Sequence, residues 1–282
     1  MEQDIKTYYT AHSVFTDPGA RAELLADMPA SAAPLAETLR GLMLMHDDIA
    51  KYPIQNERVR DTLCRYAAAI LDRLAEMDNK TPLTQKRPED QRFVANSSDF
   101  ALLCVSVLRQ KGVSARKRTG FVPCDVFYDG ERYYRLHDIV EYREGDAWQR
   151  LDPSGLSQPE DFIPAAKAWR DCRVGHAAPD KFRDEERRNF EILTAALLLD
   201  LAGLGKRELT VWDRYGWACK PFAEFDSRQW QKLDDLAIAL QKGDEAQEEL
   251  IALYNGEEGL QVPQEIWCAS PVVPPHLVKL KS

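Results

Sequence analysis

The sequence predicts an α+β fold in which a central helix packs on an antiparallel sheet, with helical regions before and after this core. Three features of the 282-residue chain lead to this prediction. Apolar residues recur at helical spacing before residue 78, and a strongly apolar segment follows Asn96. Two turn signals then divide residues 121–152 into strand-like stretches.

The N-terminal region is expected to consist of helices. An apolar stripe at three- and four-residue steps predicts one helix that carries Val59, Leu63, Tyr66, Ile70, Leu74 and Met77 on a single face. Shorter helices are predicted at 21–28 and 34–44. Residues 79–88 are polar and include two prolines, which predicts a loop before the core.

A buried helix is predicted to start directly after Asn96. Asn and Ser are favourable N-cap residues, and Asp99 in the first turn suits the positive end of the helix dipole. Residues 100–108 are apolar on most sides, so this helix is expected to be central. Gly112 is predicted as the residue that ends it.

An antiparallel meander is predicted over residues 121–152. Asp129-Gly130 lies between two aromatic pairs and favours a tight hairpin. Residues 144–145, Glu-Gly, lie between two further strand-like stretches and predict a second hairpin.

The second hairpin predicts which side chains face each other. With residues 144–145 as the loop, Arg143 faces Asp146, and the same register places His137 opposite Asp152. A carboxylate that close to an imidazole can accept the ring N–H, fix the tautomer and stabilise the imidazolium. The pair therefore provides a base and the group that orients it.

The C-terminal part is predicted to be mainly helical. Its predicted helices cover 165–172, 185–204, 229–241 and 244–254. Residues 203–213 are expected to be a connector, and the tail from Pro263 to extend over the surface. Together these patterns predict a helical region 1–80, a core 81–160 and a helical extension 161–282, in one compact unit.

Composition argues against several classes of protein. A net charge of −9 disfavours binding to nucleic acid through phosphates. The most apolar run, 195–204, contains Asp200 and is shorter than a span of about 20 residues, so no membrane partner is expected. The N-terminus shows no basic segment followed by an apolar stretch, which favours a cytoplasmic location.

The six cysteines are far apart and include no C-x-x-C pair, so no metal site is expected. Free thiols are predicted rather than disulfides. Cys104 is predicted to be a buried core thiol. Cys124 is expected in a loop near the core, where the role of a substitute nucleophile is the less favoured alternative.

The start of the buried helix is the natural place for a nucleophile. Its backbone N–H groups and its dipole favour a thiolate or an oxyanion there. The two residues at this position are Ser97 and Ser98.

Several segments resemble the transglutaminase-like superfamily, whose fold is related to papain. Asn96-Ser-Ser-Asp-Phe-Ala-Leu-Leu is similar to Asn-Cys-Arg-Asp-Phe-Ala-Leu-Leu of its bacterial members, and the Leu-Arg…Gly-Val-Ser-Ala-Arg segment and the following Gly-Phe also match. His137 begins a match to the family motif His-x-x-x-Glu-Tyr, and Asp152 matches the family aspartate. The resemblance covers roughly residues 85–215. The part of this range that follows the core resembles the C-terminal extension of one uncharacterised bacterial branch of the superfamily.

The resemblance implies a transglutaminase-like core with a catalytic triad at Ser97, His137 and Asp152. The family cysteine falls on Ser97, because Asp99 and the two residues after it fix the alignment. Serine is a much weaker nucleophile in a site suited to a thiolate. Two explanations stay open: an engineered replacement of cysteine, or a natural serine.

Three further side chains are candidates around the triad. Asn96 and Arg92 are expected to help the backbone N–H of residue 97 form an oxyanion hole, and a plain N-cap is the favoured alternative for Asn96. Glu141 is either a second partner of the site or a cross-strand partner of a basic residue.

The resemblance implies acyl transfer on a small-molecule or peptide substrate, an amide or a thioester, without a cofactor. Formation or exchange of an amide bond, in a biosynthetic setting, is the first hypothesis. An amidase or cysteine-protease-like hydrolase with the same triad is the second. A non-catalytic binding or scaffold protein that uses the old cleft is the third.

A local basic cluster stands out in an acidic chain. It consists of Arg109, Lys111, Arg116, Lys117 and Arg118. A solvated surface is the favoured interpretation. A docking patch for an acidic partner, such as a phosphopantetheine carrier protein, is the alternative.

Overall fold

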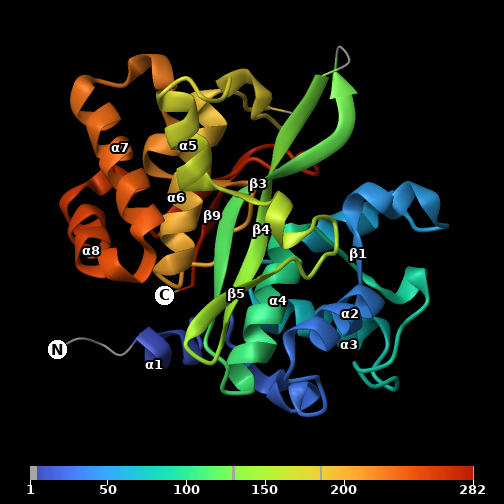
Figure 1. Ribbon diagram of the computed structural model, residues 1–282. Coiled ribbons are helices and arrows are strands. Elements are labelled where there is room, and N and C mark those ends of the chain that lie inside the picture. The colour runs from blue at the N-terminus through green and yellow to red at the C-terminus, as the bar shows by residue number, and fades with distance from the viewer. Residues whose placement is uncertain (1–4, 129–130, 185, 282) are drawn as a thin grey trace. The chain divides into compact units, whose positions relative to one another are not determined.

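Figure 1 shows the computed structural model of the chain, which mixes helices and strands as the predicted α+β class requires. It describes residues 5–128, 131–184 and 186–281, with only the backbone at 125–128 and 131. The chain forms two compact units. Unit 1 comprises Met1–Lys117 and Asp138–Pro159, and unit 2 comprises Arg118–His137 and Glu160–Ser282. The regions predicted from the sequence, 1–80, 81–160 and 161–282, stay predictions.

Unit 1 is built around one buried helix. Its helices are α1 (Ile5–Thr10), α2 (Ala32–Leu42), α3 (Ala67–Met77) and α4 (Ser97–Gln110). Each residue of α4 from Ser97 to Arg109 is buried, and α1, α2 and α3 contact it. The predicted central helix is therefore confirmed.

The single helix predicted through residues 59–77 was wrong. A 3-10 helix covers Asn56–Leu63, and α3 begins only at Ala67. Between them Cys64 and Tyr66 are extended, and the N–H of Ala67 donates to the carbonyl of Phe15 at 2.8 Å. The segment 21–28 likewise forms a 3-10 helix, Gly19–Leu25. Contacts made by distant parts of the chain override the local helical pattern here.

A short parallel pair of strands leads into α4. β1 (Met43–Met45) follows α2 directly, and β2 (Phe93–Ala95) pairs with it so that Met45 faces Ala95. The next residue, Asn96, caps α4. The polar loop predicted at 79–88 is confirmed, since it holds no helix or strand.

The predicted meander is present as a four-stranded sheet. Its strands are β3 (Ala115–Tyr128), β4 (Glu131–Glu144), β5 (Ala147–Leu151) and β6 (Ile163–Pro164), in the order β5-β4-β3-β6. β5 and β6 pair antiparallel with their neighbours. The predicted hairpin at Asp129-Gly130 lies outside the described residues.

The predicted loop of the second hairpin was wrong by one residue. Glu144 faces Ala147, so the loop is residues 145–146, and Arg143 faces Trp148 instead of Asp146. Gly145 has φ 63°, a left-handed conformation that a two-residue turn requires at its first position. The register shifts by two residues, and a shift of two leaves each side chain on its predicted face.

Unit 2 holds the four predicted C-terminal helices. They are α5 (Ala165–Arg173), α6 (Phe190–Leu204), α7 (Ser227–Lys242) and α8 (Gln247–Gly256), which lie side by side in Figure 1. α6 begins five residues later than predicted, after Asn189 with φ 58°. Its residues from Ile192 to Leu204 are all buried, so it forms the core of this unit.

The C-terminal tail forms strands that the sequence did not predict. β8 (Glu265–Cys268) lies between β7 (Asp213–Arg214) and β9 (His276–Lys279) in an antiparallel sheet. The prolines of the tail lie outside these strands, where they remove no ladder hydrogen bond. No helix in the described part of the chain is long and apolar enough to cross a membrane.

Candidate active site

Ser97 is the first residue of α4, and Asn96 caps the helix as predicted. The Asn96 Oδ1 accepts the N–H groups of Ser98 (2.8 Å) and Asp99 (3.1 Å). In return the Asp99 Oδ2 accepts the N–H of Asn96 at 2.8 Å, which completes a capping box. The side chain of residue 97 is therefore fixed at the positive end of a 14-residue helix.

Asp99 is completely buried, and burial raises the pKa of its carboxyl well above the ordinary value of 3.8. Its Oδ1 has no hydrogen-bond partner within the part of the chain that the structure describes. A neutral acid suits such a site better than a carboxylate. The Asn96 Nδ2 nearby is also buried and has no acceptor among the described residues.

A backbone group of β4 contacts the side chain of Ser97. The N–H of Asp138 donates to the Ser97 Oγ at 3.2 Å. Asp138 directly follows His137 in the chain, so one peptide bond separates the predicted base from this contact. The Ser97 side chain is 4% exposed.

The Asp138 carboxylate lies in a buried polar cluster. Its Oδ2 accepts the Nζ of Lys117 at 2.7 Å and the Oγ of Ser98 at 2.6 Å. Lys117 and Asp138 are both fully buried. The cluster joins β3, β4 and the first turn of α4, and no sequence motif indicated it.

His137 is also buried, at 1% exposure, within β4. It is the last residue of its segment of unit 2, whereas Ser97 and Asp152 belong to unit 1. Its role as the base stays a prediction. The predicted register that paired it with Asp152 was wrong, and the β4–β5 ladder ends at Val140 and Leu151.

The Asp152 carboxylate is held firmly just after β5. Its Oδ1 accepts the N–H (2.9 Å) and Oγ (2.6 Å) of Ser154, and its Oδ2 accepts the N–H and Oγ of Ser157, both at 3.0 Å. Four donors suit an ionised carboxylate, which accepts only. The turn continues to Gly155, which has φ 76°, and a Cβ added there would lie 3.1 Å from the Arg40 Cδ.

Arg92, a predicted oxyanion donor, supports the loop before β2. Its Nε donates to the carbonyl of Arg87 and its Nη2 to Glu89, each at 2.8 Å. The oxyanion roles predicted for Arg92 and Asn96 stay predictions. The cap role of Asn96, the favoured alternative, is confirmed.

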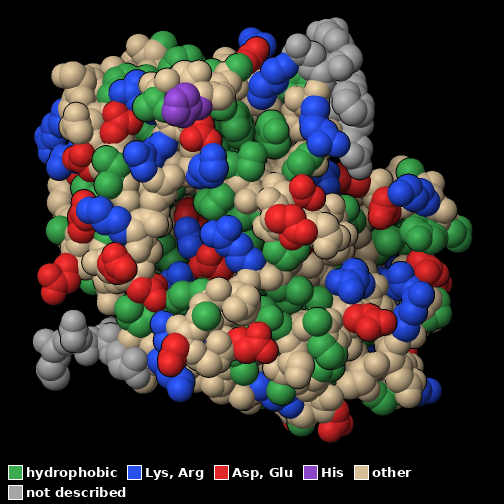
Figure 2. Space-filling model, viewed as in Figure 1, with side chains coloured by type: hydrophobic (Ala, Val, Ile, Leu, Met, Phe, Trp, Pro, Cys, Tyr) green, Lys and Arg blue, Asp and Glu red, His purple; other side chains and the backbone are tan. Residues whose placement is uncertain are grey.

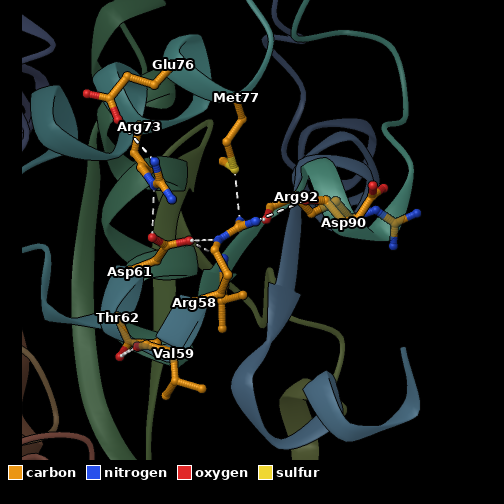
Figure 3. Close-up of polar contacts among 10 residues, drawn as sticks. Arg58, Val59, Asp61, Thr62, Arg73, Glu76, Met77, Asp90 and Arg92 are labelled. Carbon is orange, nitrogen blue, oxygen red and sulfur yellow. Dashed lines mark hydrogen bonds and ion pairs between the residues drawn. The ribbon is translucent and has the colours of Figure 1, made fainter. Parts of the chain in front are cut away.

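A buried carboxylate, Asp61, contacts the strand before α4 and was not identified from the sequence. Figure 3 shows Asp61 between Arg58 and Arg73, whose Nε atoms donate to it at 3.0 and 2.9 Å. Asp61 also accepts the N–H of Val94 in β2, and Arg58 donates to the carbonyl of Arg92. These contacts hold the strand that leads into α4.

Both interpretations of the basic cluster were wrong. Three successive cations each meet a different carboxylate: Arg116 pairs with Glu141 (2.9 Å), Lys117 with Asp138 (2.7 Å) and Arg118 with Asp200 (2.8 Å). All six side chains are buried, as is Arg109. These four buried cations therefore form neither a solvated surface nor a docking patch for a carrier protein, and only Lys111 of the cluster is half-buried. On the face shown in Figure 2, Lys and Arg lie scattered among Asp and Glu.

Glu141 takes the cross-strand role that was one of its two alternatives. It faces Arg150 in the β4–β5 ladder, and the Arg150 Nε donates to it at 3.2 Å. Arg116 donates to its other oxygen, while the Arg116 guanidinium lies 4.0 Å from the centre of the Trp148 ring. Glu141 thus balances two cations in the sheet.

Two of the thiols are buried groups that suit the core better than a nucleophile's position. Burial raises the pKa of Cys104, which confirms it as a core thiol, and raises the pKa of Cys64 to about 12. Cys124 is half-buried, and its role as a substitute stays a prediction. Within residues 5–128, 131–184 and 186–281, no three His, Cys, Asp or Glu gather as a metal site.

No protein-family model, curated protein or solved structure matches this chain. The functional assignment therefore depends on the chemistry of the residues themselves.

Proposed function

We propose that the chain is organised for transglutaminase-like acyl transfer, with residue 97 at the nucleophile position, His137 as the base and Asp152 as its orienting group. One observation supports this most strongly. The N–H of Asp138, the residue after His137, donates to the Ser97 Oγ at the start of a buried helix. The sequence neighbour of the base is thus tethered to the nucleophile position.

The start of α4 suits an anionic nucleophile or oxyanion. Backbone N–H groups of a first helical turn lack intrahelical acceptors, and the helix dipole adds positive potential. A thiolate at residue 97 gains from both, and from the additional N–H of Asp138. The four donors on Asp152 hold its carboxylate in a fixed position, as the orienting group of a histidine requires.

The proposed reaction has two steps. The nucleophile of residue 97 gives its proton to His137 and forms a bond to the carbonyl carbon of an amide or thioester. The tetrahedral intermediate collapses, the bond to the leaving amine or thiol breaks, and His137 returns the proton to it. An amine then attacks the acyl-enzyme and loses its proton to His137. The bond between the acyl group and residue 97 breaks as the amide forms, and His137 passes the proton to the sulfur or oxygen of residue 97.

The serine at residue 97 favours a second function, a non-catalytic binding protein. An alkoxide is far less accessible near neutral pH than a thiolate. We therefore expect the chain with Ser97 to turn over slowly or not at all. The acyl-transfer proposal applies fully to the form with cysteine at residue 97.

Intact-mass spectrometry on the Ser97→Cys protein with a simple acyl thioester tests the proposal. One acyl group is expected on residue 97, and none on the parent chain. Ser98→Cys is the matched control, because it moves a buried thiol by one position on the same helix and should not be acylated. Acylation of the control alone would contradict the proposal.

Products with and without an added amine separate the alternatives. An amide that forms at the expense of free acid indicates transfer, whereas free acid alone indicates a hydrolase. If Ser97→Cys takes no acyl group, the acyl-transfer proposal fails and the binding function gains support.

A further inference from the structure

The proposed reaction makes no direct use of the ion pair between Lys117 and Asp138. Their Nζ and Oδ2 atoms lie 2.7 Å apart, and both side chains are 0% exposed. Burying an ammonium and a carboxylate removes both from water, and apolar residues of similar volume often stabilise a fold equally well. Stability alone therefore does not account for this pair.

The ion pair holds the two serines at the start of α4. The Asp138 Oδ2 that pairs with Lys117 also accepts the Ser98 Oγ at 2.6 Å. The backbone N–H of the same aspartate donates to the Ser97 Oγ at 3.2 Å. One residue of β4 thus contacts both helix residues, and Lys117 of β3 fixes its carboxylate.

We propose that Lys117 and Asp138 are positioning residues for residue 97. Lys117 fixes the Asp138 carboxylate, which fixes the Ser98 hydroxyl and so the distance between the first turn of α4 and β4. At this distance the backbone N–H of Asp138 can donate a hydrogen bond to the side chain of residue 97. The catalytic consequence rests on the proposed function, whereas the effect on the reactivity of residue 97 does not.

Other charged groups near the start of α4 remain unchanged in the test. Asp99 lies in the same turn, and Arg65 and Asp61, whose charges act on its carboxyl, are kept in every variant. His137, which precedes Asp138 in β4, is kept as well. A change in thiol reactivity is therefore attributable to the buried pair.

The test measures alkylation of residue 97 in the Ser97→Cys protein. Iodoacetamide is the probe, and alkylation rates are measured across neutral and alkaline pH. Peptide mapping distinguishes residue 97 from the six native cysteines. The variants are Lys117→Met, Asp138→Leu and the double variant. Lys51→Met with Asp48→Leu is the matched control, because this pair lies at 2.6 Å but is exposed.

Each single variant removes one charge of the buried pair and keeps the other, and is expected to unfold at lower urea concentration. The double variant is expected to unfold at a urea concentration close to that of the parent. Its alkylation rate at neutral pH should nevertheless fall about tenfold, with a rise of about one unit in the apparent pKa of the thiol. The exposed control should match the parent.

A conservative rescue separates positioning from general damage. Lys117→Met with Asp138→Asn restores an acceptor for the Ser98 Oγ without a buried charge, and should recover part of the rate. If the Lys117→Met and Asp138→Leu double variant keeps the parent's pH profile, the inference is overturned. If the profile shifts as expected but no thioester acylates residue 97, the positioning role stands and the proposed function fails.

Discussion

The backbone N–H of Asp138 donates to the Oγ of Ser97 over 3.2 Å, which joins β4 to the first residue of α4. A buried helix start and a strand are thereby held together at one side chain. The Asp138 carboxylate adds a second link to the same helix through Ser98. The Ser97 side chain therefore lies beside a fixed backbone donor of β4.

The ion pair of Arg118 and Asp200 should be important for stability. The Arg118 Nε and Nη2 both donate to the Asp200 carboxylate at 2.8 Å, and the N–H of Thr119 donates to it at 2.9 Å. Asp200→Ala removes the carboxylate that accepts from the buried Arg118 guanidinium and should lower the free energy of unfolding by about 3–5 kcal/mol. Urea denaturation measures this loss in the free energy of unfolding.

Asp72→Ala is the control for this prediction. It removes a carboxylate at 2.7 Å from Arg21, but both side chains are exposed. Solvent screens such pairs, so the urea midpoint should hardly move. Equal losses in the two variants would contradict the importance given to burial.

The turn at Gly145 depends on its left-handed backbone. A Cβ at this position meets nothing within 4 Å, so the effect of Gly145→Ala comes only from φ 63°. We expect a loss of about 1 kcal/mol in the free energy of unfolding. Gly256→Ala, equally open but without a positive φ, should be neutral or slightly stabilising. A loss no greater at Gly145 than at Gly256 would rule out the assigned turn.

The raised pKa of Asp99 predicts a dependence of stability on pH. The folded protein keeps a proton that the unfolded chain releases above about pH 4, so the free energy of unfolding falls as pH rises from there towards the folded pKa. The slope for one proton is at most about 1.4 kcal/mol per pH unit. Asp99→Asn lacks this term and should become more stable relative to the parent as pH rises.

Denaturation curves at several pH values above 4 test this prediction. Asp27→Asn, at an exposed position, is the control and should follow the parent at each pH. A constant difference between Asp99→Asn and the parent would show that Asp99 is ionised in the folded protein.

The seryl hydroxyls on Asp152 should matter for acyl transfer if Asp152 orients the base. Ser154→Ala with Ser157→Ala removes two of its four donors and leaves both backbone N–H groups. In the Ser97→Cys protein we expect the acylation rate to fall several-fold, with a loss of about 1 kcal/mol in stability per hydroxyl. An unchanged rate would remove Asp152 from the proposed triad.

Features encoded within a few residues were predictable from the sequence. Asn96 is the expected N-cap, Asp99 lies in the first turn as expected, and Gly112 ends α4 with φ 76°. The N–H of Val113 donates to the carbonyl of Leu108, which completes the C-terminal cap. Each of these signals depends on spacing along one turn of helix, so no distant partner is needed to recognise it.

Features that depend on distant partners were not predictable. Arg118 meets Asp200 from 82 positions away, and a run of three basic residues reads locally as a solvated surface. The hairpin loop was misplaced because both Glu-Gly and Gly-Asp are plausible turn pairs. The contact of Ser97 with Asp138 likewise depends on how α4 packs on β4, which no local pattern encodes.

The dependence of residue 97 on His137 tests the central claim most directly. Rate constants for acylation by one thioester would be compared between Ser97→Cys and Ser97→Cys with His137→Gln, after the urea midpoints are shown to agree. The proposal predicts a loss of at least about 100-fold without the imidazole, and a loss of the pH dependence that the imidazole confers. Equal rates in the two proteins would show that His137 is not the base and would contradict the proposed triad.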